Sequence, residues 1–308
     1  LPMPYYHAGS ECFNFGMDYN NFTRMQAASV MHGIPDMGCF LSRTPLDQTL
    51  HSIQLILKPC QPPRIFSLMT DSRPIAVVCE AKDWDWFKSL YPHLLSEAPL
   101  AYSDQTVVVA ELRPEYIENY RRAHMAQADE RIQSGQLTRK GDWFVEKADL
   151  PLFYEGFDTL QGCASVFQGR GALCGVMSDT VTLWRGNLAS LGAAQGELRL
   201  SIWIRATHNG AMTHHINFVH RDKNTGAIRS ELTHGLLWHP KAVLEDWVLF
   251  DVPFNADTAP EAETHIFFHK KNMPFAFVAD EMLIYHPDGQ NYMLRDKHMV
   301  HNNIWYVR

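Results

Sequence analysis

The residues best suited to chemistry lie in a run of strict alternation at 197–205, ELRLSIWIR. Apolar residues alternate there with Arg199, Trp203 and Arg205, and this period of two predicts a strand with one buried and one open face. An indole ring flanked by guanidinium groups suits a sugar, because pyranose C–H groups stack on the ring and hydroxyls bond to planar polar groups. Trp203, Arg199 and Arg205 are therefore candidate ligand-binding residues.

Two further runs predict strands that extend the same open face. If the strand at 214–221 buries its apolar residues, His215 and Asn217 point outward beside Trp203. The strand at 264–270 places His265 there by the same reasoning. The competing interpretation is that this face packs on another domain, since Trp and Arg are also enriched at protein interfaces.

The sequence shows no motif of a known catalytic frame. It has 16 histidines, but they form no HExxH or other metal-binding frame, and no GxSxG nucleophile turn is present. A carboxylate pair is conceivable among the acids near residues 80–85 and 104. Acidic residues in the first turn of a helix explain Asp83 and Asp85 more simply. Whether the chain is an enzyme stays open at this point.

Composition excludes some partners. The net charge of −7 argues against nucleic acid or an anionic membrane surface, because phosphate binding requires a basic footprint. No apolar run reaches the 18 residues of a membrane span. The chain opens with LPMPYY and has no signal segment. We therefore expect either a soluble region excised from a longer chain or a mature chain, with membrane association only through an upstream segment.

The order of patterns predicts two domains and a short extension. The first, at 1–140, alternates helical and strand patterns and is expected to be a small α/β layered domain. Its predicted helices lie at 21–32, 45–58, 83–91 and 114–133, and its strands at 39–42, 65–69, 73–79 and 106–112. The second, at 150–290, consists of short strands separated by turns, which predicts an antiparallel β-sandwich. Residues 291–308 are expected to form a C-terminal extension.

The six cysteines leave two interpretations open. Four of them, Cys12, Cys39, Cys60 and Cys79, lie before residue 80, and Cys163 and Cys174 lie in the second half. Pairing within each half is arithmetically possible. Reduced, buried cysteines that act as small apolar residues are an equal alternative.

The second half resembles the jelly-roll carbohydrate-binding modules of families 4, 9 and 22. The resemblance covers about residues 150–290 and is carried by four pieces: FYEGFD at 153–158, LSIWIR at 200–205, EDWVLFDVPF at 245–254 and FVADEMLI at 277–284. It implies a jelly-roll fold and often a structural calcium ion between the first and last strands. Asp158 and Asp280, with Glu155 as a further oxygen donor, are the residues at matching places.

The first half resembles the soluble extracytoplasmic region of some bacterial polytopic glycosyltransferase-like proteins. The matching pieces are FNFG at 13–16, SRTPLD at 42–47, RPIAVV at 73–78 and YSDQTVVVAEL at 102–112. This resemblance implies a periplasmic or cell-surface location within a cell-envelope or glycan-processing protein. The catalytic residues of such a transferase would lie upstream of this chain.

Together these observations predict non-catalytic recognition of a glycan or glycolipid by the sandwich. One alternative is a protein-interaction or structural module whose sandwich face packs on another domain. Another is an enzyme with a site between the two domains. A buried Trp203 would favour the packing interpretation, and an exposed Trp203 in a groove would favour sugar binding.

Overall fold

The computed structural model describes the chain except for residues 2, 4–6, 10–13, 16–18, 34–38, 42–44, 70–72, 149, 151, 161–162, 164, 177–179, 207–214 and 270–275. Cys12 and His214 lie outside the described residues. The chain divides into two compact units, Leu1–Ala126 and Gln127–Arg308. None of the helices in the described part is both long and apolar enough to cross a membrane.

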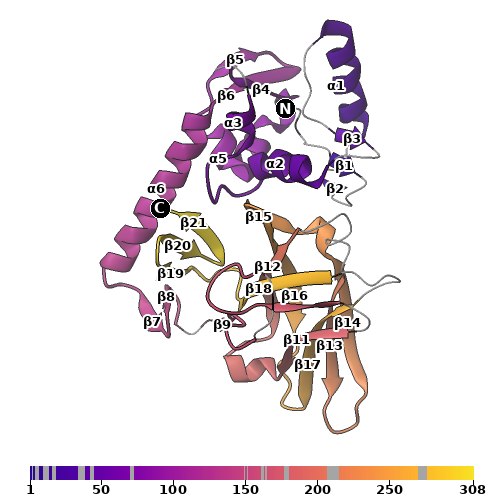
Figure 1. Cartoon of the computed structure of the whole chain (residues 1–308), viewed down its shortest axis with the longest axis vertical. Coiled ribbons are helices and arrows are strands. Elements are labelled where there is room, and N and C mark those ends of the chain that lie inside the picture. The colour runs from indigo at the N-terminus through magenta and orange to yellow at the C-terminus, as the bar shows by residue number, and fades with distance from the viewer. Residues whose placement is uncertain are drawn as a thin grey trace. The chain divides into compact units, whose positions relative to one another are not determined.

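The first unit combines helices with short strands (Figure 1). Its elements are β1 (His7–Gly9), β2 (Asn14–Phe15), α1 (Tyr19–His32), β3 (Cys39–Leu41), α2 (Leu46–Ile56), α3 (Ile65–Leu68), β4 (Ile75–Glu80), the 3₁₀ turn η1 (Ala81–Asp83), α4 (Trp84–Leu90), α5 (Pro92–Leu95), β5 (Leu100–Ser103), β6 (Val107–Leu112) and α6 (Pro114–Gln133), which continues into the second unit.

The core of this unit forms where helices cover an antiparallel sheet. Strands β4, β6 and β5 pair in that order, and Val77 and Ala110 are buried together with Ile56 of α2 and Leu94 of α5. The strands alternate along the chain with helices, but each described pair in this sheet is antiparallel. The α/β layered domain expected from the sequence therefore stays a prediction.

One element of the first unit was predicted wrongly. The apolar run at 65–69 was expected to be a strand, but its residues form the short helix α3. The Phe66 N–H donates to the carbonyl of Pro63 at 3.3 Å, so the turn begins at the Pro62-Pro63 pair. Proline is favoured in the first helical turn, and a short apolar run by itself does not distinguish a strand from a buried helix.

The second unit is almost entirely β structure (Figure 1). Its elements are β7 (Thr138–Lys140), β8 (Trp143–Val145), β9 (Leu152–Glu155), β10 (Leu173–Val176), β11 (Thr180–Gly186), η2 (Leu188–Leu191), β12 (Gly196–Arg205), β13 (His215–Asp222), β14 (Ile228–Gly235), η3 (Leu236–Trp238), β15 (Pro240–Leu244), β16 (Trp247–Ala256), β17 (Ala262–His269), β18 (Ala276–Tyr285), β19 (Asn291–Arg295), β20 (His298–His301) and β21 (Ile304–Val307).

Two antiparallel sheets of this unit form a β-sandwich. The six-stranded sheet has the order β10-β18-β12-β16-β15 with β9 paired to β18, and the four-stranded sheet has the order β11-β17-β13-β14. Their inner faces meet in aromatic contacts, of which the closest joins Phe218 of β13 and Phe254 of β16 at 4.4 Å between ring centroids. Alternate residues of β12, β13 and β17 enter this core, as the period of two predicts.

The C-terminal residues are part of a third sheet. Residues 291–308 form β19, β20 and β21. These strands pair with β8 and β7 in one sheet, in the order β21-β20-β19-β8-β7. The expected extension is therefore integrated into the second unit. The division between the units lies within α6 rather than in the polar segment near residue 140, because β7 and β8 pair with the distant C-terminal strands.

Candidate functional site

Trp203 does not lie on an open face. It stands on the outer side of β12, as expected, but it has 0% exposed surface. Its Nε1–H donates to the Asn303 carbonyl at 2.9 Å, and the Asn303 side chain donates to the Ser201 and Glu281 carbonyls. The third sheet thus covers this part of β12. The expectation of an exposed indole platform is wrong, because a fully covered ring offers no surface to a sugar.

A loop closed by a disulfide covers the other side of the same indole. Cys163 and Cys174 are bonded, and we call residues 163–174 the disulfide loop. The loop's Phe167 ring stacks on Trp203 at 4.5 Å between centroids and meets Trp247 and Trp305 edge-on. Phe167 therefore occupies the face of the Trp203 ring on which the sequence predicted that a ligand would stack.

The cysteines divide between the two interpretations drawn from the sequence. The pair in the second half forms the disulfide, whereas Cys79 is free and buried, and Cys60 is buried. Burial raises the pKa of the Cys79 thiol to about 11, so it stays protonated. Cys39 lies in β3, and its side chain is outside the described residues.

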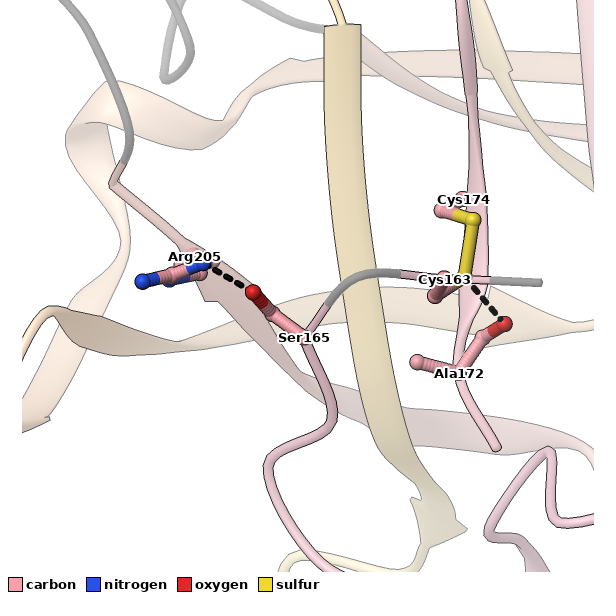
Figure 2. The surroundings of a disulfide bond; sticks show 5 residues. All are labelled: Cys163, Ser165, Ala172, Cys174 and Arg205. Carbon is pink, nitrogen blue, oxygen red and sulfur yellow. Dashed lines mark hydrogen bonds between the residues drawn. A yellow bond between two sulfur atoms is a disulfide. The ribbon is translucent and has the colours of Figure 1, made fainter. Parts of the chain in front are cut away.

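The two candidate arginines are held by carboxylates. Arg205 pairs with Asp246. Arg205 also donates to the hydroxyl of Ser165 in the disulfide loop, as Figure 2 shows. The Arg199 Nε–H donates to Asp251 at 2.9 Å, and Lys241 lies 2.5 Å from the same carboxylate. Both arginines therefore have structural partners within the six-stranded sheet and its loop.

The remaining candidates lie on the other sheet. His215 and Asn217 are on β13 and His265 is on β17, so they occupy the outer face of the four-stranded sheet. The sequence expected all six ligand-binding candidates on one face. The structure separates them, because β12 belongs to one sheet of the sandwich and β13 and β17 belong to the other.

Phe267 is the centre of this second surface. It is half-buried, and strand register places it between Thr182 of β11 and Asn217 of β13, with Thr233 of β14 beyond Asn217. The His265 ring lies 4.5 Å from the Phe267 ring, and its Nε2 is 2.8 Å from the Thr182 hydroxyl. We call Thr182, Asn217, Thr233, His265 and Phe267 the open-face row.

Asn217 has an unused donor in this row. Its side chain is only 5% exposed, and its Oδ1 accepts a hydrogen bond from the Thr233 hydroxyl at 2.7 Å. Its Nδ2 has no hydrogen-bond partner among the residues that the structure describes. An amide donor left without a partner costs free energy, and this one is shielded from solvent. Burial lowers the pKa of His265, which favours its neutral ring.

A buried pair of carboxyl groups lies at a bulge in the closing strand. The register of β18 on β12 shifts between Ser201 and Trp203, and Asp280 and Glu281 are at this irregularity. Glu281 adopts a φ of 51°, in the left-handed region that is unfavourable for residues with a Cβ. Bulges redirect side chains, and both carboxyl groups are here fully buried on the side of the disulfide loop and third sheet.

The disulfide loop, the first strand and the third sheet all bond to this pair. Asp280 Oδ2 accepts hydrogen bonds from the Phe167 and Gln168 amides at 2.9 and 3.3 Å. Glu281 accepts one from the Tyr154 hydroxyl of β9 and lies 3.4 Å from Arg295 of β19. Burial raises the pKa of Asp280 to about 7 and that of Glu281 to about 8, although these donors favour the charged forms.

A cleft of about 710 Å³ opens beside the pair. Its lining residues come from the turn after β9, the disulfide loop and the end of β19: Asp158, Thr159, Val166, Phe167, Gln168, Gly169, Arg170, Arg295 and Asp296. Asp158, on this cleft, is near enough to Asp280 to disfavour the charged form of its carboxyl group. Glu155 accepts a hydrogen bond from the Phe157 amide at 2.9 Å. The calcium ion that these three residues were expected to hold stays a prediction.

Comparisons with known proteins match only parts of this fold. A xylan-binding domain of family 22 is 11% identical over 48% of this chain and 88% of its own, with a TM-score of 0.26. The C-terminal family 22 carbohydrate-binding module of Clostridium thermocellum Xyn10B is 13% identical over 49% of this chain and 89% of its own, with a TM-score of 0.26. A family 61 module in complex with β-1,4-galactotriose is 12% identical over 50% of this chain and 94% of its own, with a TM-score of 0.22.

No protein-family model and no curated protein sequence matches the chain. The solved structures above are carbohydrate-binding modules, but at these TM-scores they decide nothing about function. We therefore argue function from the residues of this chain alone. The resemblance of the first half to glycosyltransferase-like proteins stays a prediction.

Proposed function

We propose that the second unit is a non-catalytic jelly-roll module that binds a glycan on the outer face of its four-stranded sheet. The observation that carries this proposal is the open-face row, where an accessible aromatic ring is flanked by hydroxyl, amide and imidazole groups. A sugar presents the complementary pattern of C–H faces and hydroxyls. The strand order of the two sheets is consistent with a jelly roll of two Greek keys.

In this proposal each member of the row has a separate role. The Phe267 ring stacks on a pyranose face, and the exposed Thr233 hydroxyl, which donates to Asn217 Oδ1, accepts a hydrogen bond from a sugar hydroxyl. His265 and Thr182 offer a further donor and acceptor at the edge of the ring. We assign no role to Trp203, whose surface is fully covered.

We further propose that the parent protein works outside the cytoplasm, in the cell envelope or in glycan processing. The Cys163–Cys174 disulfide supports this location, because such bonds persist in oxidising compartments. The first unit, as an α/β domain, would then act as a spacer or docking unit. A glycolipid headgroup would present the same sugar chemistry as a free glycan.

A glycan-array screen of the purified chain tests the proposal, with Phe267→Ala and Leu294→Ala as a matched pair. Leu294 is an exposed apolar residue of β19 and lies outside the four-stranded sheet. We expect a glycan that the wild type and Leu294→Ala bind equally, with roughly tenfold weaker binding by Phe267→Ala, about 1.4 kcal/mol. Absence of binding to any glycan, or equal binding by both variants, would contradict the proposal.

A further inference from the structure

The guanidinium group of Arg295 lies between two carboxyl groups beside the cleft, those of Glu281 and Asp158. Arg295 Nη1 is 3.1 Å from the Tyr154 hydroxyl and 3.4 Å from Glu281 Oε1, and its Nη2 is 3.6 Å from Asp158 Oδ2. The guanidinium also lies 6.0 Å from the centre of the Trp305 ring. Arg295 thus connects the first strand, the closing strand and the third sheet.

A positive charge stabilises carboxyl groups at this place. Asp280 and Glu281 have no exposed surface, and Arg295 lies within ion-pair distance of Glu281 and of Asp158 at the cleft. A buried carboxylate is tolerated only when an opposite charge and hydrogen bonds replace the lost water. In a sandwich of this kind, either a metal ion or a side chain could supply that charge.

The oxygens expected to bind calcium are engaged with protein donors. Both oxygens of Asp280 accept backbone N–H groups, from Phe167 and Gln168 at Oδ2 and from Glu281 at Oδ1. Asp158 Oδ1 accepts the Arg170 amide at 2.6 Å. Calcium takes six to eight oxygens. Among the described residues, no three His, Cys, Asp or Glu side chains are arranged to hold one metal ion. The donor set therefore does not fit calcium.

We propose that Arg295 is the cation of this cluster. Its guanidinium takes the electrostatic place of a metal ion between the first and last strands, so the second unit folds and stays stable without calcium. The planar fork of arginine suits this place because it bonds several oxygens at once and always carries its charge. The inference is independent of glycan binding on the opposite sheet.

Thermal unfolding with and without calcium gives the direct test. We expect the Tm of the wild-type chain to be the same in excess CaCl₂ and in EDTA, because an ion that binds the folded state would raise it. Arg295→Met should melt well below the wild type. Arg170→Met should not, because Arg170 lines the same cleft but contacts Asp158 only through its backbone. A wild-type Tm that rises with calcium would overturn the proposal.

A double mutant separates charge from packing. Glu281→Gln replaces the carboxyl group that Arg295 contacts with a neutral amide and keeps an oxygen for the Tyr154 hydroxyl. If Arg295 acts through its charge, Glu281→Gln should raise the Tm of Arg295→Met and restore part of its loss. If Arg295 acts only by filling space, the second change would restore nothing, and the proposal fails. Should Arg295→Met not fold, Arg295→Lys and the wild-type calcium comparison still decide.

Discussion

The two sheets of the sandwich both have apolar inner faces, but their outer faces differ in how far they are covered by other parts of the unit. On the six-stranded sheet, the third sheet and the disulfide loop cover the outer face around Trp203, and Trp203 is fully buried. On the four-stranded sheet, Phe267 is half-buried and its neighbours Thr182 and Thr233 are exposed. Apolar and polar residues alternate in the same way along β12 and β17. The outward ring of Trp203 on β12 is nevertheless packed, whereas that of Phe267 on β17 is partly exposed to solvent.

The difference shows that alternation identifies which side of a strand faces the core, but not whether the other side is exposed or covered by another segment. Trp203 lies 100 residues from Asn303, whose carbonyl it bonds, so no local pattern around β12 reports the cover. The predictions below test whether the covered face contributes stability and the open face is free for binding.

Truncation of the covered indole should have the largest effect. We expect Trp203→Ala to lower the free energy of unfolding by roughly 3–5 kcal/mol, because it leaves a cavity against Phe167 and removes the hydrogen bond to Asn303. Urea unfolding followed by circular dichroism measures the loss. A variant within about 1 kcal/mol of the wild type would mean that the face is not packed as described.

Removal of the disulfide should have the next largest effect. The bond closes a loop with a sequence separation of 11, so Cys163→Ser/Cys174→Ser should lose about 2–3 kcal/mol of stability. The loss should also loosen Phe167 on Trp203 and increase quenching of tryptophan fluorescence by acrylamide. The reduced wild type is the control and should match the double variant. If reduction leaves the stability unchanged, the loop is held by its other contacts alone.

Acid should weaken the contact between the two sheets. The buried His220 of β13 bonds the Thr264 hydroxyl at 2.7 Å and donates from Nε2 to the Asn255 carbonyl of β16 at 3.0 Å. Burial lowers its pKa below 6.5, which favours the neutral ring in the folded state. Its contribution is full above pH 6.5 and declines as the pH falls below that value, because the unfolded chain then takes up the proton first.

Denaturant titrations between pH 5 and 8 measure this slope. The part of the slope that His220 contributes, which is the difference between the wild type and His220→Gln, should stay below the limit of about 1.4 kcal/mol per pH unit that one proton sets. His220→Gln should flatten the dependence. The matched His265→Gln, on the open face, should change it less, because His265 remains partly solvated. Equal effects of the two variants would remove the distinction between the buried and the open histidine.

The smallest effect on stability is expected on the open face. Phe267→Ala should cost about 1 kcal/mol or less, because the ring is half-buried and its loss opens a surface rather than a cavity. Thermal melting of this variant beside Trp203→Ala compares the two faces directly. A loss as large as that of Trp203→Ala would mean that the open-face row is a packing surface.

The amino-acid sequence by itself determined the local elements and the core side of most strands. Alternating residues located β12, β13, β16, β17 and β18, and cap and spacing signals located helices such as α2 at Leu46–Ile56. These features depend on neighbours within a few residues, where the helix and strand periods act directly.

Only the tertiary structure decided which sheet each candidate residue joins and which face is covered. It divided Trp203 from Asn217 and His265, placed Phe167 and Asn303 on the indole, and paired β19 with β8 across more than a hundred residues. It also brought Arg295, which no sequence motif marked, to the carboxyl groups of β18. Such contacts form because separate segments bury their apolar surfaces together, and no local period records them.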